Sequence, residues 1–152
     1  MALPDIFTTA VAENVIQRIN QLTPGATPQW GKMNVSQMLA HCNVTYELVY
    51  DNKHPKPGFF MKFIMKTLAK KAVTSETPFK HNSPTASSFL ITNEREFETE
   101  KNRLVAHIRK TQQLGAAHFD QKESHSFGVL TITEWNNMFY KHLDHHLTQF
   151  GV

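Results

Sequence analysis

The stretch from Trp135 to Phe150 reads WNNMFYKHLDHHLTQF. Its apolar residues recur at spacings of three and four, which predicts an amphipathic helix: Trp135, Met138, Phe139, Leu143, Leu147 and Phe150. Because each residue turns about 100° around a helix axis, His142 and His146 fall inside this apolar stripe. Lys141, Asp144 and Thr148 are expected on the solvent side. The C-terminal helix therefore presents two imidazoles towards the interior of the protein.

His142 and His146 lie one helical turn apart and point the same way, so they can share one metal ion. His145 falls at one edge of the stripe. A buried histidine pair can also be structural, with each ring nitrogen satisfied by a side chain or by water. The helix alone leaves both interpretations open.

The bulk composition is that of one ordinary globular domain. A chain of 152 residues has room for a single domain with a sizeable core, here residues 1–152. Hydrophobic residues make up 40% and charged residues 19%, which argues against disorder. The net charge of +3 is mild, and no nucleic-acid-binding motif is present, so we expect no nucleic-acid partner.

Cys42 is the single cysteine, which excludes an internal disulfide and a cysteine-rich zinc site. The first residues, MALPDIF, lack the basic segment and apolar core of a signal peptide. No apolar run is long enough to span a membrane. We therefore expect a cytoplasmic protein.

Three further stretches have helical periodicity: residues 5–22, residues 34–49 and residues 93–114. Polar residues three apart mark the N-termini of the last three helices as capping pairs: Asn34 with Gln37, Asn93 with Glu96, and Thr131 with Glu134. Residues 116–130 read as a polar loop with a turn at Phe127-Gly128. Four amphipathic helices without a convincing set of strands predict an all-α four-helix bundle.

Between the second and third bundle helices, the stretch Phe59 to Val73 predicts an extra short helix, and residues 74–91 a long loop. Lys62, Lys66 and Lys70 recur at i+4 along that helix. A basic amphipathic helix can lie on an anionic membrane surface. We favour the alternative, a solvated lysine face on a helix packed against the domain. So long a loop is uncommon unless it covers a site or is flexible.

His41 lies at the shoulder of the apolar stripe of residues 34–49. Bundle helices turn their apolar faces to one core, so His41 can converge with His142 and His146. Three histidines with an open fourth position are typical of catalytic zinc, whereas a structural site needs a fourth protein ligand. Of the neighbouring residues, we assign Tyr46 to core packing and Glu47 to a solvated carboxylate.

Several motifs resemble the DinB-like (YfiT-like) metalloenzyme superfamily, and most closely a bacterial branch that ends in a similar Gln-Phe-Gly: Gly31-Lys32-Met33-Asn34, Gln37-Met38-Leu39-Ala40-His41 and His142-x-x-His145-His146-x-x-Gln149-Phe150-Gly151. The resemblance implies an up-down-down-up four-helix bundle, often dimeric, with a divalent metal on three histidines. Carried over, the ligands are His41, His142 and His146. His145 is expected beside the ligands or at the surface, and Gln149 matches without an assigned role.

The chain also departs from the family pattern. Leu147 stands where many relatives have Arg, and the helix and loop of residues 59–91 look like an insertion that could cover the metal.

The resemblance implies a metal-dependent enzyme that acts on a small molecule. Superfamily members include thiol-dependent S-transferases and a thiol-dependent isomerase, so thiol transfer with a low-molecular-weight thiol is one expectation and hydrolysis another. Zinc or nickel is the expected metal, and manganese or iron also accept imidazole. We expect a homodimer without a membrane partner. The alternative is a non-catalytic metal- or ligand-binding bundle that acts as an interaction module.

Overall fold

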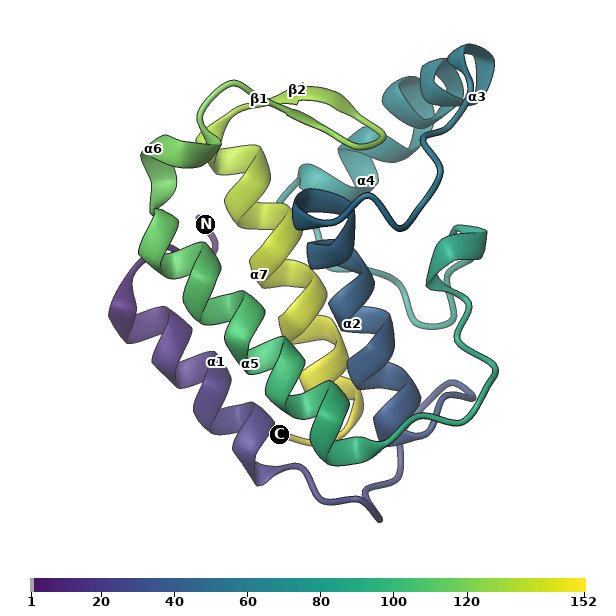
Figure 1. The fold of residues 1–152 in the computed structure, drawn as a ribbon, viewed down its shortest axis with the longest axis vertical. Coiled ribbons are helices and arrows are strands. Elements are labelled where there is room, and N and C mark those ends of the chain that lie inside the picture. The colour runs from purple at the N-terminus through teal and green to yellow at the C-terminus, as the bar shows by residue number, and fades with distance from the viewer. Residues whose placement is uncertain (1) are drawn as a thin grey trace.

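The computed structural model describes residues 2–152 and is mostly helical, with one small two-stranded sheet. Its elements in chain order are α1 (Thr9–Gln21), α2 (Val35–Tyr50), α3 (Phe59–Ile64), the π-helical turn η1 (Met65–Ala69), α4 (Lys70–Thr74), the 3-10 turn η2 (Ser87–Phe89), α5 (Phe97–Leu114), α6 (Ala116–Phe119), β1 (Lys122–Ser124), β2 (Gly128–Leu130) and α7 (Ile132–Gln149). The four long helices α1, α2, α5 and α7 lie side by side (Figure 1). Both α1 and α2 pack against α5 and α7.

The hydrophobic core lies between these four helices. The predicted stripe of α7 is confirmed, because Trp135, Phe139, Leu143 and Leu147 are each 1% exposed or less. They join one buried cluster with apolar residues of the other long helices, among them Ile19, Met38 and Ile108. Burying each large apolar side chain stabilises the fold by roughly 1.5–3 kcal/mol. This burial fixes which face of α7 points inwards.

Two of the three predicted capping pairs are confirmed. Asn34 with Gln37 caps α2, and Thr131 with Glu134 caps α7, each as a complete capping box. The prediction for α5 was wrong, because Glu96 is itself the N-cap and its carboxylate accepts from the backbone N–H groups of residues 98 and 99. An ionised side chain at the N-terminus also interacts favourably with the helix dipole.

The first helix begins later than predicted, at Thr9 rather than Asp5. Thr8 is extended and its hydroxyl accepts from the N–H of Val11, so it is the N-cap. Residues 2–7 therefore precede the helix, and Ile6 and Phe7 are nevertheless buried in the core.

Lys141 is buried, which corrects its predicted place on the solvent side. Its side chain donates to the carbonyls of Ala72, Ser75 and Thr77 at 2.8, 2.6 and 3.0 Å. Ala72 lies in the last turn of α4, where helix carbonyls lack intrahelical partners, and Ser75 and Thr77 follow the end of the helix. Lys141 thus fastens the C-terminal end of α4 to α7, and Phe79 lies 4.6 Å below its ammonium group.

The predicted polar loop at residues 116–130 contains secondary structure that the sequence did not reveal, although the predicted turn is present at residues 125–127 between β1 and β2. This stretch forms the short helix α6 and an antiparallel hairpin in which Glu123 pairs with Val129. The Ser124 hydroxyl closes the turn by accepting from Phe127 N–H at 2.9 Å and donating to the Gly128 carbonyl at 2.8 Å. Three-residue strands are too short to show a period of two in the sequence.

Residues Phe59–Thr74, which we call the arm, comprise α3, η1 and α4 and confirm the extra helix. The last part of the arm, α4, packs against α7 as expected, but α3 and η1 do not pack against the bundle, because they contain no buried residue. Phe59, Phe60 and Phe63 are 93%, 75% and 60% exposed. In Figure 1, α3 stands away from the four long helices.

Two of the three lysines on the predicted face of the arm, Lys62 and Lys70, are paired rather than simply solvated. Lys62 pairs with Glu123 of the hairpin at 2.7 Å, and Lys70 pairs with Glu134 of α7 at 2.9 Å. These contacts hold the arm beside the hairpin. None of the helices within residues 2–152 is both long and apolar enough to cross a bilayer.

Candidate metal centre

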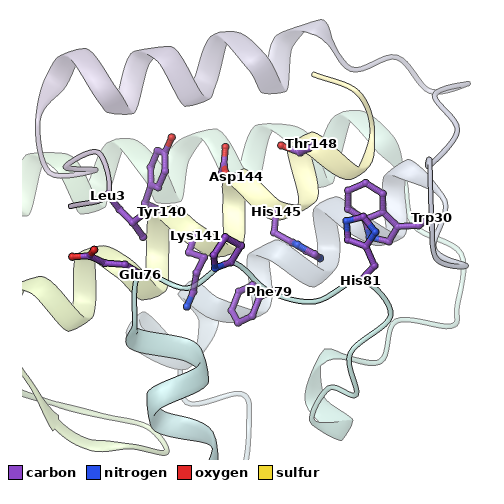
Figure 2. Close-up of a pocket in the computed structure, with 11 residues that line it drawn as sticks. Leu3, Trp30, Glu76, Phe79, His81, Tyr140, Lys141, Asp144, His145 and Thr148 are labelled. Carbon is purple, nitrogen blue, oxygen red and sulfur yellow. The ribbon is translucent and has the colours of Figure 1, made fainter. Parts of the chain in front are cut away.

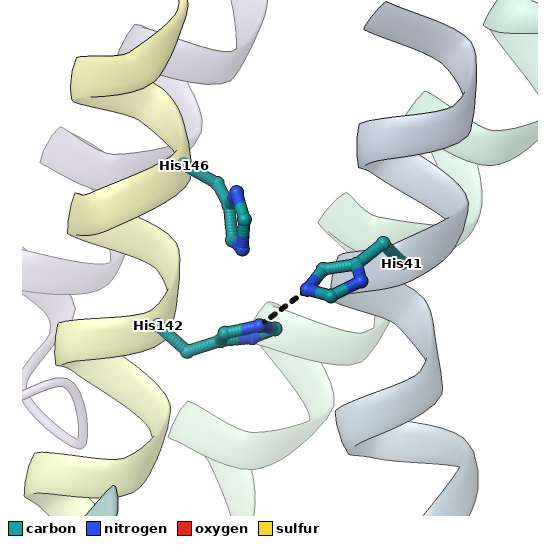
Figure 3. Close-up of side chains that lie close together, drawn as sticks. All are labelled: His41, His142 and His146. Carbon is teal, nitrogen blue, oxygen red and sulfur yellow. Dashed lines mark hydrogen bonds between the residues drawn. The ribbon is translucent and has the colours of Figure 1, made fainter. Parts of the chain in front are cut away.

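Three histidines from two helices meet on the inner side of α2 and α7. His41 comes from α2, and His142 and His146 come from successive turns of α7, as the i and i+4 spacing predicts. The rings point towards one another (Figure 3). The Nε2 atoms of His41 and His142 are 3.0 Å apart, and one nitrogen from each ring lies within 4.8 Å of the others.

Each of the three rings has its second nitrogen occupied by an oxygen. His41 Nδ1–H donates to the Phe89 carbonyl at 2.9 Å, and His146 Nδ1–H donates to Gln149 Oε1 at 2.7 Å. His142 Nδ1 hydrogen-bonds the Thr45 hydroxyl at 3.0 Å. A carbonyl and an amide oxygen only accept, so they fix the proton of His41 and of His146 on Nδ1, orient these rings and leave their Nε2 lone pairs for a metal. The Thr45 hydroxyl can donate to His142 Nδ1 or accept from it.

The electrostatic environment keeps these rings neutral. Burial lowers the pKa of His41, places that of His142 well below its usual value, and lowers that of His146 to about 3. Neighbouring histidines act in the same direction because like charges repel. Neutral imidazole is the form that binds metals, so no proton must be displaced at neutral pH.

The donor set fits a divalent ion. Three imidazole nitrogens bound to one zinc ion at 2.0–2.1 Å stand about 3.4 Å apart. In the triad, the shortest distance between two ring nitrogens is 3.0 Å, and all three nitrogens lie within 4.8 Å of one another. The value for bound zinc falls inside this range. His41, His142 and His146 could therefore hold a metal ion with small side-chain adjustments.

The comparison with known families agrees over nearly the whole chain. A family model described as "Protein of unknown function (DUF1569)" matches residues 6–151. The chain belongs to the DUF1569 family. No curated protein and no solved structure matches it.

In this DUF1569 chain, His145 points away from the triad. Its ring lies 5.6 Å from those of Trp30 and Phe79 and 6.1 Å from that of His81. Trp30 stacks on His81 at 3.7 Å. Figure 2 shows these side chains around a small cavity of about 180 Å³ beside α7. The cluster that could hold a metal does not include His145.

Gln149 acquires a role that the motif comparison did not give it. While its Oε1 accepts from His146, its Nε2 donates to the Trp30 carbonyl at 2.6 Å. Gly31, next in the chain, has a φ of +85°, and a Cβ there would lie 2.6 Å from Gln149 Nε2. Gly31 and Gln149 belong to two separate motifs of the sequence, and the structure joins them into one support for His146.

The triad opens into a large cavity of about 1420 Å³. The cavity is lined by α2 and α7 on the triad's side, by the arm, and by much of the loop of residues 79–92. The arm and this loop thus border the space in front of the triad. A metal held there would have room for a further ligand.

Two neighbours on α2 point elsewhere. Tyr46 is 1% exposed and stacks on Phe139 and His107, which confirms its assignment to the core. Glu47 is not a solvated carboxylate, because it is 9% exposed, pairs with Arg103 and accepts from His54 Nε2 at 2.7 Å. Burial works against its ionisation, but these two partners outweigh it and lower the pKa of Glu47.

The sequence carried partial signals for the supporting groups. Thr45 stands four residues after His41, and Gln149 three residues after His146, so both share a helix face with a ligand. Phe89 contributes its backbone carbonyl, which any residue possesses, so residue type gave no signal there.

Proposed function

We propose that this DUF1569 protein is a DinB-like metal-dependent enzyme that acts on a small molecule at His41, His142 and His146. The observation that carries the proposal is the orientation of the three rings. All three Nδ1 atoms are tied to oxygens while one nitrogen of each ring faces a common point. The Nε2 atoms of His41 and His142 face each other at 3.0 Å, and a metal ion at the common point would replace that hydrogen bond by ligation to both rings.

The order of the helices supports the superfamily placement. In Figure 1, α1 and α7 run in one direction, and α2 and α5 run in the other. This order is that of an up-down-down-up bundle. The homodimer that the resemblance implies is tested by light scattering on the purified protein.

The chemistry follows from an open metal position. A divalent ion at the triad, zinc or nickel in preference to manganese or iron, lowers the pKa of a water or thiol that it binds. The chain's own residues orient the three imidazoles, keep them unprotonated and leave a cavity for the reactants. This arrangement suits thiol S-transfer with a low-molecular-weight thiol, or hydrolysis.

Elemental analysis of protein purified without a His tag tests the site. Wild type is expected to contain about one divalent ion per chain, and His41→Ala, His142→Ala and His146→Ala are expected to lose it. His145→Ala is the matched control on the same helix, and it should retain the ion. Wild type that stays metal-free after reconstitution would refute the metal centre.

Whether the protein stays folded after metal removal distinguishes an enzyme from a binding module. For an enzyme site, metal removal should leave the circular dichroism spectrum unchanged and abolish activity in thiol-transfer or hydrolase screens. If the metal-free chain unfolds instead, the ion is structural, and the non-catalytic module becomes the better description.

A further inference from the structure

The large cavity has an apolar wall built by the arm. Met61, Met65, Ala69 and Val73 recur every four residues and all line the cavity. Trp135 and Met138, which precede His142 by two turns and one turn of α7, also line it. Met side chains are flexible and polarizable, so they adapt to ligands of irregular shape. One side of the arm thus forms an apolar surface that faces the cavity.

The arm cannot simply fold onto the bundle and close this space. Lys141 fixes the end of α4 through three backbone carbonyls. Lys62 and Lys70 fix the arm laterally to Glu123 and Glu134. Because the arm is held at both its end and its side, the cavity is a built feature of the fold.

The charges around the cavity have one sign. Lys32, Lys56 and Lys80 are among its lining residues, and among residues 2–152 no Asp or Glu lines it. The only other ionisable lining groups are histidines. A ligand with a negative group therefore meets attraction at several points and no carboxylate to repel it.

The volume of the cavity further restricts the class of ligand that would fill it. Pockets for drug-sized molecules measure roughly 300–1,000 Å³, and this cavity of about 1420 Å³ exceeds that range. A small hydrophilic thiol alone would leave the Met and aromatic walls in contact with water. A long apolar chain would cover them.

We propose that this cavity binds an anionic amphiphile, a molecule with a long apolar chain against the arm and an acidic head group near the lysines and the triad. This inference names the substrate class of the proposed enzyme, but the chain-binding wall does not depend on a metal. The proposed function and the ligand class can therefore fail separately.

Binding of saturated fatty acids of increasing chain length, measured by displacement of a dansylated fatty acid below the critical micelle concentration, tests the proposal. Affinity is expected to rise roughly fourfold for each added CH2 group until the cavity is full. The alcohol of equal length should bind more weakly than the acid, and the alkyltrimethylammonium ion most weakly. Affinity independent of chain length, or tightest for the cation, would overturn the proposal.

Two substitutions on η1 test where the ligand's hydrocarbon chain binds. Ala69→Trp fills the cavity side of the arm and is expected to weaken binding at least about tenfold. Thr67→Trp, two residues away at an exposed position that does not line the cavity, is the matched control and should bind like wild type. Equal loss in both variants, with circular dichroism confirming that both are folded, would show that the chain binds elsewhere.

Measurements on chelator-treated protein separate this inference from the metal. Persistence of the chain-length dependence after metal removal supports the ligand class even if no metal is found in wild type. Loss of the chain-length dependence would overturn the inference, because binding of the ligand's hydrocarbon chain would then require the metal ion rather than the apolar wall of the arm. The same probe supplied in phosphatidylcholine vesicles identifies its source. If the probe moves from the vesicles to the protein and the protein sediments with the vesicles, the natural ligand is a bilayer lipid. If the probe moves and the protein stays in solution, the ligand is a free amphiphile. Both outcomes support the binding site.

Discussion

Replacing Gly31 by Ala should damage the metal centre from outside it. The new Cβ would stand 2.6 Å from Gln149 Nε2, closer than a carbon and a nitrogen can approach without movement. Gln149 can withdraw only by giving up its bonds to the Trp30 carbonyl and to His146 Nδ1. His146 would then lose the group that orients its ring.

The magnitude follows from two contributions. Gly31 has a φ of +85°, and a left-handed conformation costs a residue with a Cβ roughly 1–2 kcal/mol. Two lost hydrogen bonds add about 1 kcal/mol each. We expect Gly31→Ala to lower the free energy of unfolding by about 3 kcal/mol, and to weaken metal binding by roughly 10–100-fold because a ligand loses its outer partner.

Urea unfolding of the metal-free protein measures the first quantity, and competition with a colorimetric zinc chelator the second. Gly25→Ala is the matched control, because a Cβ there meets nothing within 4 Å, and it should change stability by no more than about 0.5 kcal/mol. In the double variant Gly31→Ala/Gln149→Ala the clash is gone, so its loss should be smaller than the sum of the single losses.

Two results would refute this reasoning. If Gly31→Ala behaves like Gly25→Ala in both assays, the close approach is not rigid. If stability falls while zinc affinity stays unchanged, Gln149 does not position His146.

Three further predictions concern other parts of the molecule. Lys141→Met leaves three carbonyls without their donor and should cost about 2–3 kcal/mol in urea unfolding, with faster amide exchange in α4. The exposed Lys71→Met is the control, and equal losses would contradict the tether. The metal-free protein should lose stability as pH falls from 6.5 towards 3, because the unfolded chain binds protons that the folded one resists. The pKa of about 3 for His146 corresponds to about 1.4 kcal/mol per pH unit from that residue, so His146→Leu should flatten the slope by this amount, and an unchanged slope would refute the assignment. Thr45→Val removes the oxygen beside His142 and should weaken zinc binding about tenfold in the chelator assay, whereas unaltered affinity would show that the hydroxyl does not orient the ring.

The sequence by itself determined the features that depend on local spacing. Trp135, Phe139 and Leu143 share a face because 3.6 residues make a turn, and the same rule put His142 and His146 side by side. The capping boxes at Asn34 and Thr131 were equally readable, since their partners stand three residues away. These are properties of a short segment and need no knowledge of its neighbours.

The tertiary structure decided what lies opposite each helix. Lys141 reads as a solvent-facing residue, and only the arrival of residues 72–77 over α7 turns it into a buried tether. Glu47 is held by Arg103 from another helix, and His41 by the Phe89 carbonyl from a distant loop. Such contacts join residues far apart in the chain and often use backbone groups common to all residue types. The sequence pattern therefore places the histidines on their helices, whereas the packing of those helices decides that the three rings meet.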